Sequence, residues 1–551
     1  MKTCVTTLAS LLLVAGVSAA AAISGAAATT GRQWEVVELA LESSRERANA
    51  YAEVDLHVSF AGPDGASLVR PAFWDGGRTW RVRFAPPRTG RWTWRSVGSD
   101  ESDAGLHGRT GTIDVAAYDG ANPLVRHGLL KASPARRSVV HHDGTPFLMV
   151  ADTPWALPFR GTPETVLEYA RDRQAKGFNA ALLMSVQPDR DARGPRSRTE
   201  AEGFDVGLED LADGHLLRLV PAYFQKLDRL LDILHAHGIA PVVNPVFQGF
   251  GWKGKRTLGG GADPAEYARY VRYLVARYGA RPALWLVSAD GTGKEPVVEP
   301  AGLEIEKWDA YGQPTGIHYS PFDDRKADWT DDPRYGFHGN RSWQDAPWLD
   351  FQWCQTGHGG EHLQHKVRLM HDNRPTKAVA NGEPTYEGIR SPEMAAGWWQ
   401  GHEAWMSFTA GGAMGIVYGA GGLWQWKLSA DEPGWPEWAD GKGRSWRDAL
   451  RQPGSALAAG VGRALAGYDT TDLTKLPDVG PQAVGRAGEM YVVYLPEGGD
   501  TTLAGLRTPL PYRWLDPKTG AVRGEGTVAP GAPKLGAPSR EPWVLIAGRA
   551  R

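Results

Sequence analysis

Short segments in which apolar and polar residues alternate follow one another between residues 34 and 117. An alternation of period two is typical of strands that bury one face. Turn-forming sequences, GPDG at 62–65 and DGG at 75–77, separate these segments. The pattern therefore predicts an N-terminal β-sandwich over residues 33–118. Its strand candidates are residues 34–41, 54–60, 79–84, 90–97 and 111–115.

From about residue 124 the pattern changes, and short apolar runs alternate with helix-like segments. Leucines at 227, 230, 231 and 234 have the spacing of one buried helix face. Alternating strands and helices indicate a parallel sheet covered by helices, and eight strands indicate a (β/α)8 TIM barrel, here over residues 124–468. An open doubly wound sheet is the alternative. The strand candidates are residues 147–151, 180–184, 240–246, 283–287, 316–319, 349–353, 377–380 and 415–418.

The last part of the chain returns to strand-like patterns at 490–494, 512–514 and 543–547, with a turn sequence, DPKTG, at 516–520. We expect a C-terminal β-sandwich over residues 470–551. The predicted fold class is thus α/β, a TIM barrel flanked by an N-terminal and a C-terminal β-sandwich.

The first 28 residues have the pattern of a signal peptide. Lys2 precedes an apolar run at 8–17, and small residues follow at 18–22. The run is too short to cross a bilayer. We therefore expect a secreted, extracellular protein. Since Cys4 lies in this leader, the mature chain would keep only Cys354 and could form no internal disulfide.

Charge and aromatic content narrow the range of partners. The 551 residues contain 61 Lys plus Arg and 63 Asp plus Glu, a formal net charge of −2. Because nucleic acids and anionic membranes need a basic surface, we expect neither as a partner. The chain has 23 tryptophans. Most would fill the core, but exposed indole rings also stack on sugar faces, so a carbohydrate substrate is expected.

Two acidic residues lie where the active site of a TIM barrel forms, at the carboxyl ends of the strands. Asp290 follows the fourth predicted strand and Glu383 the seventh. Either residue alone is more often a cap or an ion-pair partner. Together, on the rim of one barrel, they match the two carboxylates that glycoside hydrolysis requires. We take them as the catalytic candidates.

Further polar and aromatic residues follow other predicted strands. Such groups bind hydroxyls and tune carboxylate pKa values, although for each one a packing role is as plausible as a substrate contact. For Asp152, orienting the site or capping a loop is favoured. The candidates for substrate binding are Asp152, Trp155, His318, Tyr319, Gln355, His358, Tyr386 and Trp424.

Other chemistries have weaker support. Histidines at 358, 362 and 365 suit one helix face, but without an HExxH motif we expect no metal, and no cofactor. A lipase-like GxSxG motif is absent from the sequence, which disfavours an esterase. Cys354 lies in an apolar strand and is expected to be buried. A carbohydrate- or matrix-binding protein on an inactive barrel stays open as an alternative to an enzyme.

Several motifs in order give a closer comparison: DGTPF at 143–147, DTPW at 152–155, AKGFN at 175–179, WLVSAD at 285–290, WLDF at 348–351, QTGH at 355–358, GEPTYE at 382–387 and YGA at 418–420. FWDG at 73–76 and TWRV at 79–82 match the domain that usually precedes this barrel. The chain resembles the apiosidase-like glycoside hydrolases over nearly its whole mature length.

The resemblance implies a catalytic TIM barrel between an N-terminal β-sandwich and a C-terminal domain named for collagen binding. It implies Asp290 as the general acid/base and Glu383 as the nucleophile of a retaining hydrolase. The family often has Gly-Gly-Asp where this chain has Ser288-Ala289-Asp290. The expected activity is exo-cleavage of a plant or microbial polysaccharide or oligosaccharide, with an apiosidase- or arabinofuranosidase-like substrate. Long segments at 187–219 and 249–262 could close a pocket for exo action.

Overall fold

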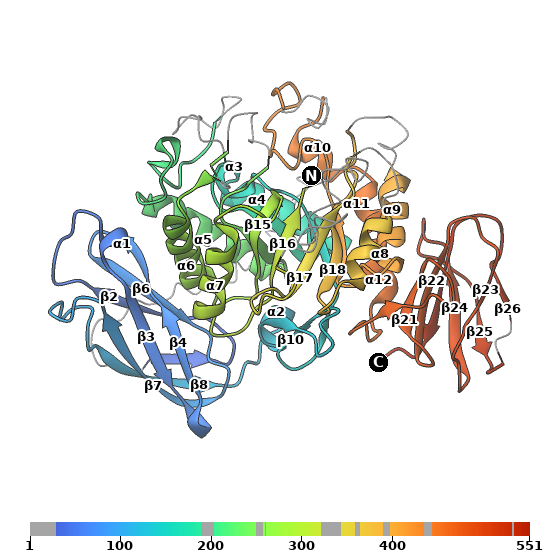
Figure 1. Ribbon diagram of the computed structural model, residues 1–551, viewed down its shortest axis with the longest axis horizontal. Coiled ribbons are helices and arrows are strands. Elements are labelled where there is room, and N and C mark those ends of the chain that lie inside the picture. Colours follow the sequence, from blue (N-terminus) through green and yellow to red (C-terminus); the bar gives the residue numbers. More distant parts are fainter. Residues whose placement is uncertain are drawn as a thin grey trace, which may run out of the picture.

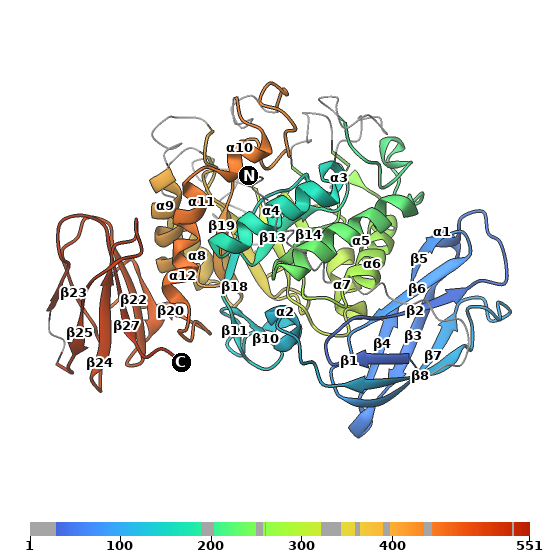
Figure 2. The same cartoon turned by 180° about the vertical axis from the view of Figure 1, so that it is seen from behind.

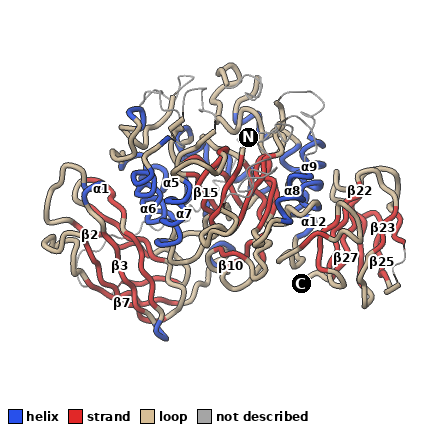
Figure 3. The backbone as a smooth tube through the Cα atoms, in the orientation of Figure 1, coloured by secondary structure: helices blue, strands red, loops and turns tan. Residues whose placement is uncertain are grey.

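The computed structural model describes residues 29–188, 203–249, 257–258, 261–320, 343–358, 364–389, 397–434, 443–531 and 534–551. The expected signal peptide at 1–28 lies outside these residues. Two regions made mainly of strands flank a central region of alternating strands and helices (Figures 1 and 3).

The central region is a parallel barrel. Its strands are paired in chain order, and the first, β12, also pairs with the last, β19. Met414 N donates to Val379 O at 3.2 Å, which brings the start of β19 against β18 and nearly closes the ring. The predicted barrel is confirmed and the open doubly wound sheet is wrong, because such a sheet keeps two free edges. The strands are β12 (Met149–Asp152), β13 (Ala180–Met184), β14 (Ala240–Asn244), β15 (Leu284–Gly291), β16 (Thr315–Tyr319), β17 (Phe351–Gln355), β18 (Ala378–Glu383) and β19 (Gly415–Tyr418).

Helices cover the outside of the barrel, and local sequence sets their ends. Thr162 caps α4 with a reciprocal capping box, and Gly177 ends it with a left-handed φ of 94°. The leucine stripe of α5 is buried, as its spacing predicts. The barrel helices are α3 (Leu157–Arg160), α4 (Pro163–Lys176), α5 (Pro221–Ala236), α6 (Pro264–Tyr278), α7 (Val298–Trp308), α8 (Gln364–Asp372), α9 (Gly397–Thr409), α10 (Trp446–Leu450), α11 (Gly454–Ala458) and α12 (Gly460–Leu465).

The two ends of the barrel differ. Helices α3 and α10 lie at the upper end in Figure 1, where the strands have their carboxyl ends. A short helix and a three-stranded sheet lie at the lower end. In a TIM barrel, the carboxyl ends of the strands are where a functional site forms. The lower elements are α2 (Pro123–Arg126), β9 (Leu130–Ala132), β10 (Val139–His141) and β11 (Pro146–Phe147).

The N-terminal region is the predicted sandwich, with one sheet of order β1-β8-β7-β3-β4 and another of order β2-β6-β5. Phe60 and Phe84 stack between them with ring centroids 4.0 Å apart. Three strands escaped prediction, β1, β4 and β5. In β4 and β5 a buried charged residue, Arg70 and Asp75 respectively, breaks the apolar alternation. The elements are β1 (Thr29–Arg32), β2 (Val37–Glu42), α1 (Ala50–Glu53), β3 (Leu56–Ala61), β4 (Ser67–Pro71), β5 (Phe73–Gly76), β6 (Thr79–Phe84), β7 (Gly90–Gly98) and β8 (Thr110–Ala116).

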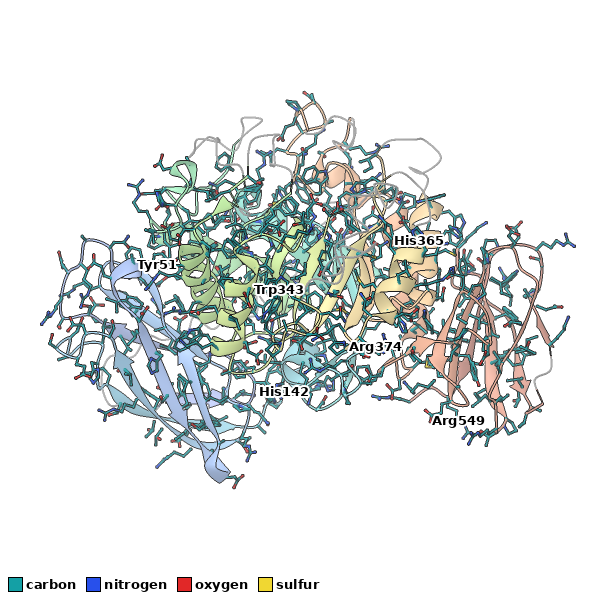
Figure 4. All side chains as sticks on the ribbon, viewed as in Figure 1. Tyr51, His142, Trp343, His365, Arg374 and Arg549 are labelled. Carbon is teal, nitrogen blue, oxygen red and sulfur yellow. The ribbon has the colours of Figure 1, made fainter. Side chains whose placement is uncertain are left out.

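A buried ion network joins this sandwich to helices α5 and α6. Asp228 accepts from Arg83 of β6 and from Arg277 of α6, each at 2.7 Å, and Arg277 also donates to Asp75 at 2.9 Å. Burial alone would raise the pKa of the Asp228 carboxyl, but the two arginines hold it well below its usual range. Figure 4 shows Tyr51 at the same junction, with its ring 5.6 Å from that of Tyr273. The sandwich and the barrel therefore share one polar interface.

Changing Asp228 to Asn should lower the free energy of unfolding by about 3–5 kcal/mol, because two buried guanidinium groups lose the carboxylate that they share. Since the pKa of Asp228 is depressed by folding, its contribution is present above the carboxyl's ordinary pKa and fades as pH falls through the folded value. Urea denaturation followed by tryptophan fluorescence should show a large deficit at pH 7 that shrinks in acid. Asp114, in the exposed pair with Arg91, is the control. Equal effects of the two Asn variants would contradict the role of the buried network.

The C-terminal region packs against α9 and α12 (Figure 2). Its larger sheet has the order β20-β21-β22-β27-β24-β25, and β23 pairs with β26 in a second sheet. Tyr494 of β22 and His402 of α9 share a 2.6 Å hydrogen bond across the contact. The strands are β20 (Thr474–Lys475), β21 (Ala483–Arg486), β22 (Met490–Leu495), β23 (Asp500–Thr502), β24 (Leu510–Leu515), β25 (Val522–Val528), β26 (Lys534–Gly536) and β27 (Trp543–Gly548).

Two further expectations from the sequence concern Cys354 and the helices, and the structure can be compared with each. Cys354 is fully buried in β17, and burial raises the pKa of its thiol to about 12, so it is no nucleophile. Within the described residues, none of the helices has both the length and the apolar character needed to span a bilayer.

Candidate active site

Asp290 and Glu383 both lie at the carboxyl ends of barrel strands. Glu383 is the last residue of β18, and Asp290 is the last but one of β15. The strand expected to end at 287 runs on to Gly291, because β15 stays paired with β16 through two irregular steps in register. Asp290 is therefore held by the sheet itself, and not by the loop that follows it.

The backbone at Asp290 has an unusual conformation. Its φ of 55° lies in the left-handed region, which costs free energy for a residue with a Cβ and is found at functional sites. The Asp290 N–H donates to His318 Nδ1 at 3.1 Å, and the residue is 9% exposed. Gly249, after β14, lies against the carboxyl group so closely that a Cβ there would overlap Asp290 Oδ2. These contacts fix where the carboxyl group points.

The Glu383 carboxylate is surrounded by hydrogen-bond donors. His358 Nε2 hydrogen-bonds to Oε1 at 2.9 Å, and the Gln355 side chain also hydrogen-bonds to the carboxylate. His318 Nε2 faces Oε2 at 3.4 Å without a hydrogen bond between them. Burial raises the pKa of Glu383, but the His358 hydrogen bond, the two imidazoles and Gln355 outweigh it and hold the pKa below its usual value. Glu383 is therefore ionised at neutral pH.

The backbone sets the proton positions on both histidines. His318 Nδ1 accepts from Asp290 N–H, and His358 Nδ1 accepts from Tyr386 N–H at 3.4 Å. In a neutral imidazole this assigns the proton to Nε2, the atom that faces Glu383 in both rings. Burial lowers the pKa of His318, so it is neutral at pH 7. The His318 imidazole thus lies between the Asp290 backbone and the Glu383 carboxylate.

Aromatic side chains surround this cluster. The Tyr386 hydroxyl accepts from Trp155 Nε1 at 2.9 Å, and the Tyr386 ring lies 4.6 Å from that of His358. Trp155 packs edge-on to His318 at 5.8 Å and also contacts Phe247. Burial, together with the charge of Glu383, raises the pKa of Tyr386 well above its usual value. Tyr386 therefore stays a neutral hydroxyl beside the carboxylate.

Five of the predicted binding residues thus lie in this cluster: Trp155, His318, Gln355, His358 and Tyr386.

The other three predicted binding residues have different surroundings. Asp152 is fully buried and pairs with Arg173 at 2.5 Å and with the Tyr169 hydroxyl at 3.1 Å, so it holds α4 against β12. The Tyr319 hydroxyl accepts from Gln352 inside the barrel. Trp424 is 8% exposed, and its carbonyl accepts from Ala156 N–H at 3.0 Å, which ties the loop after β19 to the loop after β12.

Three residues near the cluster escaped the sequence analysis. Glu403 of α9 is buried and accepts from Thr356 and from the Thr385 N–H, so it pins the loops after β17 and β18. Gln248 braces β15 by accepting from Ala289 N–H at 2.9 Å. Neither residue could be identified from the sequence, because Glu403 lies far along the chain from the loops that it contacts and Gln248 lies in an irregular loop.

Asn244, the third, ends β14, and its position at a strand end could have marked it. It is fully buried, and neither amide atom has a hydrogen-bond partner among the described residues. Buried polar groups in native proteins are seldom left unpartnered. Asn244 is therefore an additional candidate for contact with substrate.

Among the described residues, no group of three His, Cys, Asp or Glu side chains is placed to hold a metal ion. His362, one of the three histidines considered above, lies outside the described residues.

Comparison with known families adds to this geometry. The sequence model of the apiosidase-like catalytic domain matches residues 133–472, well over half of the chain. The chain belongs to the apiosidase-like family of glycoside hydrolases. A second model, for a domain of unknown function (DUF5060), matches residues 30–99. Both matches end before the C-terminal sheets, so the likeness of this region to the domain named for collagen binding stays an expectation. No protein with a curated description matches the chain.

Solved structures share the fold of this apiosidase-like protein at low sequence identity. A structure described as that of a glycoside hydrolase from Bacteroides vulgatus ATCC 8482 has a TM-score of 0.68 and 16% identity, and the match covers 94% of this chain and 99% of that one. A glycoside hydrolase family 5 structure from the same organism has a TM-score of 0.60 and 19% identity, over 77% and 94% of the two chains. These likenesses support the barrel architecture.

Proposed function

We propose that this apiosidase-like protein is a retaining glycosidase in which Glu383 is the nucleophile and Asp290 the general acid/base. The observation that carries the assignment is the set of donors around Glu383, which keeps a buried carboxylate ionised and ready to attack. Asp290 lies across His318 from it, with its carboxyl group held by Gly249.

The reaction would proceed in two steps. Glu383 attacks the anomeric carbon while Asp290 gives its proton to the glycosidic oxygen, so the bond to the leaving group breaks and a glycosyl ester of Glu383 forms. Asp290, now a carboxylate, then takes a proton from water, whose oxygen attacks the same carbon and releases Glu383. Retention requires the carboxyl groups to be about 5–5.5 Å apart, whereas inversion requires about 6.5–9.5 Å.

The proposed substrate is a terminal sugar of a plant or microbial polysaccharide or oligosaccharide, of the apiose or arabinofuranose type. Exo action is supported by the length of the segments at 187–219 and 249–262, which follow neighbouring strands at the barrel mouth. Trp155 and Tyr386 are buried beside the carboxylate and are joined by a hydrogen bond. Secretion is part of the proposal and is supported by the leader-like pattern of residues 1–28.

The test is a glycan screen. Purified protein is incubated with plant and microbial polysaccharides and with aryl glycosides, and released sugars are identified by chromatography. The expected result is one released sugar, whose anomeric configuration, followed by NMR from the first minutes, is that of the substrate. A product of opposite configuration would overturn the retaining mechanism. Binding of glycans without release of any sugar would instead favour a carbohydrate-binding protein.

Changing His358 to Leu should lower kcat/KM at pH 7 by about tenfold or more, the worth of one hydrogen bond to a charged group. The sign of the pH effect follows from the Glu383 surroundings. His358 helps to lower the pKa of Glu383. Without His358 the pKa of Glu383 should rise, so that Glu383 becomes protonated, and activity is lost, at a higher pH than in the wild-type protein. A pH profile of kcat/KM tests this. As a control, His215→Leu, at an exposed histidine, should have the pH profile of the wild-type protein. If His358→Leu loses activity at the same acidic pH as the wild-type protein, the assignment is contradicted.

A further inference from the structure

A cavity lies away from the carboxyl ends of the barrel strands. It has a volume of about 340 Å³ and opens between the last barrel helices and the C-terminal sheet. Trp405 of α9 and Arg463 of α12 line one side, and Arg513 of β24 and the turn at 516–520 line the other. Figure 2 shows these helices beside the C-terminal strands. None of the residues around Asp290 and Glu383 lines this cavity.

The charge of the cavity is positive. Arg463, Arg513 and Lys518 line it, and the only acidic residue in its lining is Asp516. Both Asp516 oxygens are used within the turn, where they accept from Lys518 N at 2.8 Å and from Thr519 Oγ1 at 2.9 Å. Lys518 has an exposed acidic neighbour, Glu541, at 3.3 Å.

The two arginines are not compensated by any carboxylate in the described part of the chain. The hydrogen bonds of Arg463 go to the backbone carbonyls of Lys176 and Ala456, and that of Arg513 goes to the carbonyl of Ala464. Arg513 Nε is buried without a partner among the described residues. Burial lowers the pKa of Arg463, with no acid opposing the effect. Arg463 is exposed and Arg513 is partly buried. Guanidinium groups that lack an acidic partner are suited to a carboxylate or another anion.

The size of the cavity distinguishes among anions, because a small inorganic ion would fill only a small part of it. The volume of about 340 Å³ falls within the usual range for a small-molecule site.

We propose that this cavity binds an acidic sugar, a uronate unit of a glycan, with its carboxylate between Arg463 and Arg513. The choice of a glycan rests on the proposed carbohydrate substrate. A secondary site of this kind holds a polymer near the catalytic barrel and raises its effective concentration there. The protein would then favour acidic polysaccharides over neutral ones, independently of which terminal sugar it removes.

The test compares a trimer of galacturonic acid with the neutral trimer of galactose by isothermal titration calorimetry on the full chain. The acidic trimer should bind, more weakly as salt is added, and the neutral trimer should bind far more weakly. Arg463→Gln and Arg513→Gln should each weaken binding by about tenfold or more, since each loses a charge-assisted hydrogen bond. Arg549→Gln, at an exposed arginine that does not line the cavity, is the matched control.

Equal affinity for the two trimers, or unchanged affinity in both arginine variants, would overturn the proposal. Displacement of the acidic trimer by an equal concentration of inorganic phosphate would also overturn it, as evidence of a simple anion site. Hydrolysis of a small aryl glycoside is measured on the same samples, and both arginine variants should keep the wild-type kcat/KM. Failure of the proposed activity would appear in the hydrolysis assay alone, and failure of the second site in the binding assay alone.

Discussion

Changing Glu383 to Gln is expected to lower kcat by about 10⁴-fold or more, the scale of effect seen when an enzyme loses its nucleophile. The amide has nearly the shape of the carboxylate but carries no charge, so no glycosyl ester can form. The three donors around the position are arranged for an anion, and His358 Nε2 at 2.9 Å can still donate to the amide oxygen. The fold should therefore be kept while the chemistry is lost. Steady-state kinetics on the aryl glycoside found in the screen measures the effect.

A covalent readout makes this prediction specific to the nucleophile. An activated fluorosugar of the same configuration should add one glycosyl group to the wild-type protein, located on Glu383 by peptide mass spectrometry. The Gln variant should stay unlabelled. Glu541→Gln, at an exposed glutamate, should keep wild-type rates and labelling. A label on another residue, or a Glu383→Gln variant with substantial activity, would place the nucleophile elsewhere.

Changing Asp290 to Ala should lower kcat by about 10²–10⁴-fold on substrates with poor leaving groups, the usual contribution of general acid catalysis. Substrates with a dinitrophenyl leaving group need no protonation, so their first step should be affected far less. Azide can then replace the base-activated water, attacking the anomeric carbon and releasing the Glu383 carboxylate. The expected product is a glycosyl azide with the substrate's configuration. An azide of inverted configuration would show instead that Asp290 is the nucleophile.

Gly249 offers a second way to test Asp290 without removing its carboxyl group. A methyl group at Gly249 would overlap Asp290 Oδ2, so Gly249→Ala should displace the carboxyl group and reduce kcat on the same poor substrates. Gly261, in the same inter-strand segment, has open space where its Cβ would be, and Gly261→Ala should have no such effect. A wild-type rate in Gly249→Ala would argue against the placement of Asp290 described above.

Local sequence determined much of the fold. Strands β13 (Ala180–Met184) and β19 (Gly415–Tyr418) begin and end where the apolar runs do, since a fully buried strand has no polar face to interrupt it. Helix α4 begins and ends at its cap residues, because capping is decided within a few residues of chain. The two catalytic candidates could also be found, because parallel strands bring their carboxyl ends to one edge.

Contacts between distant segments decided what the sequence could not show. Arg70 makes β4 look polar, yet it is buried because it donates to the Val275 carbonyl of α6. Asp152 resembled a site residue because it lies at a strand end, but its carboxylate forms an ion pair with Arg173 of the following helix α4. A buried charge is stable only with a partner, and the apolar–polar pattern of two separate segments does not show that they will lie close together in the fold.

The sequence by itself determined the barrel, its flanking sheets and the two acidic positions at its mouth, since these depend on local periodicity and on the geometry of parallel strands. Only the tertiary structure decided that Glu383 is ionised, because its pKa depends on His318, His358 and Gln355, which come from different strands and loops and meet only in the folded chain. The same holds for the cavity between Arg463 and Arg513, whose charge arises where the last barrel helices and the C-terminal sheet come together.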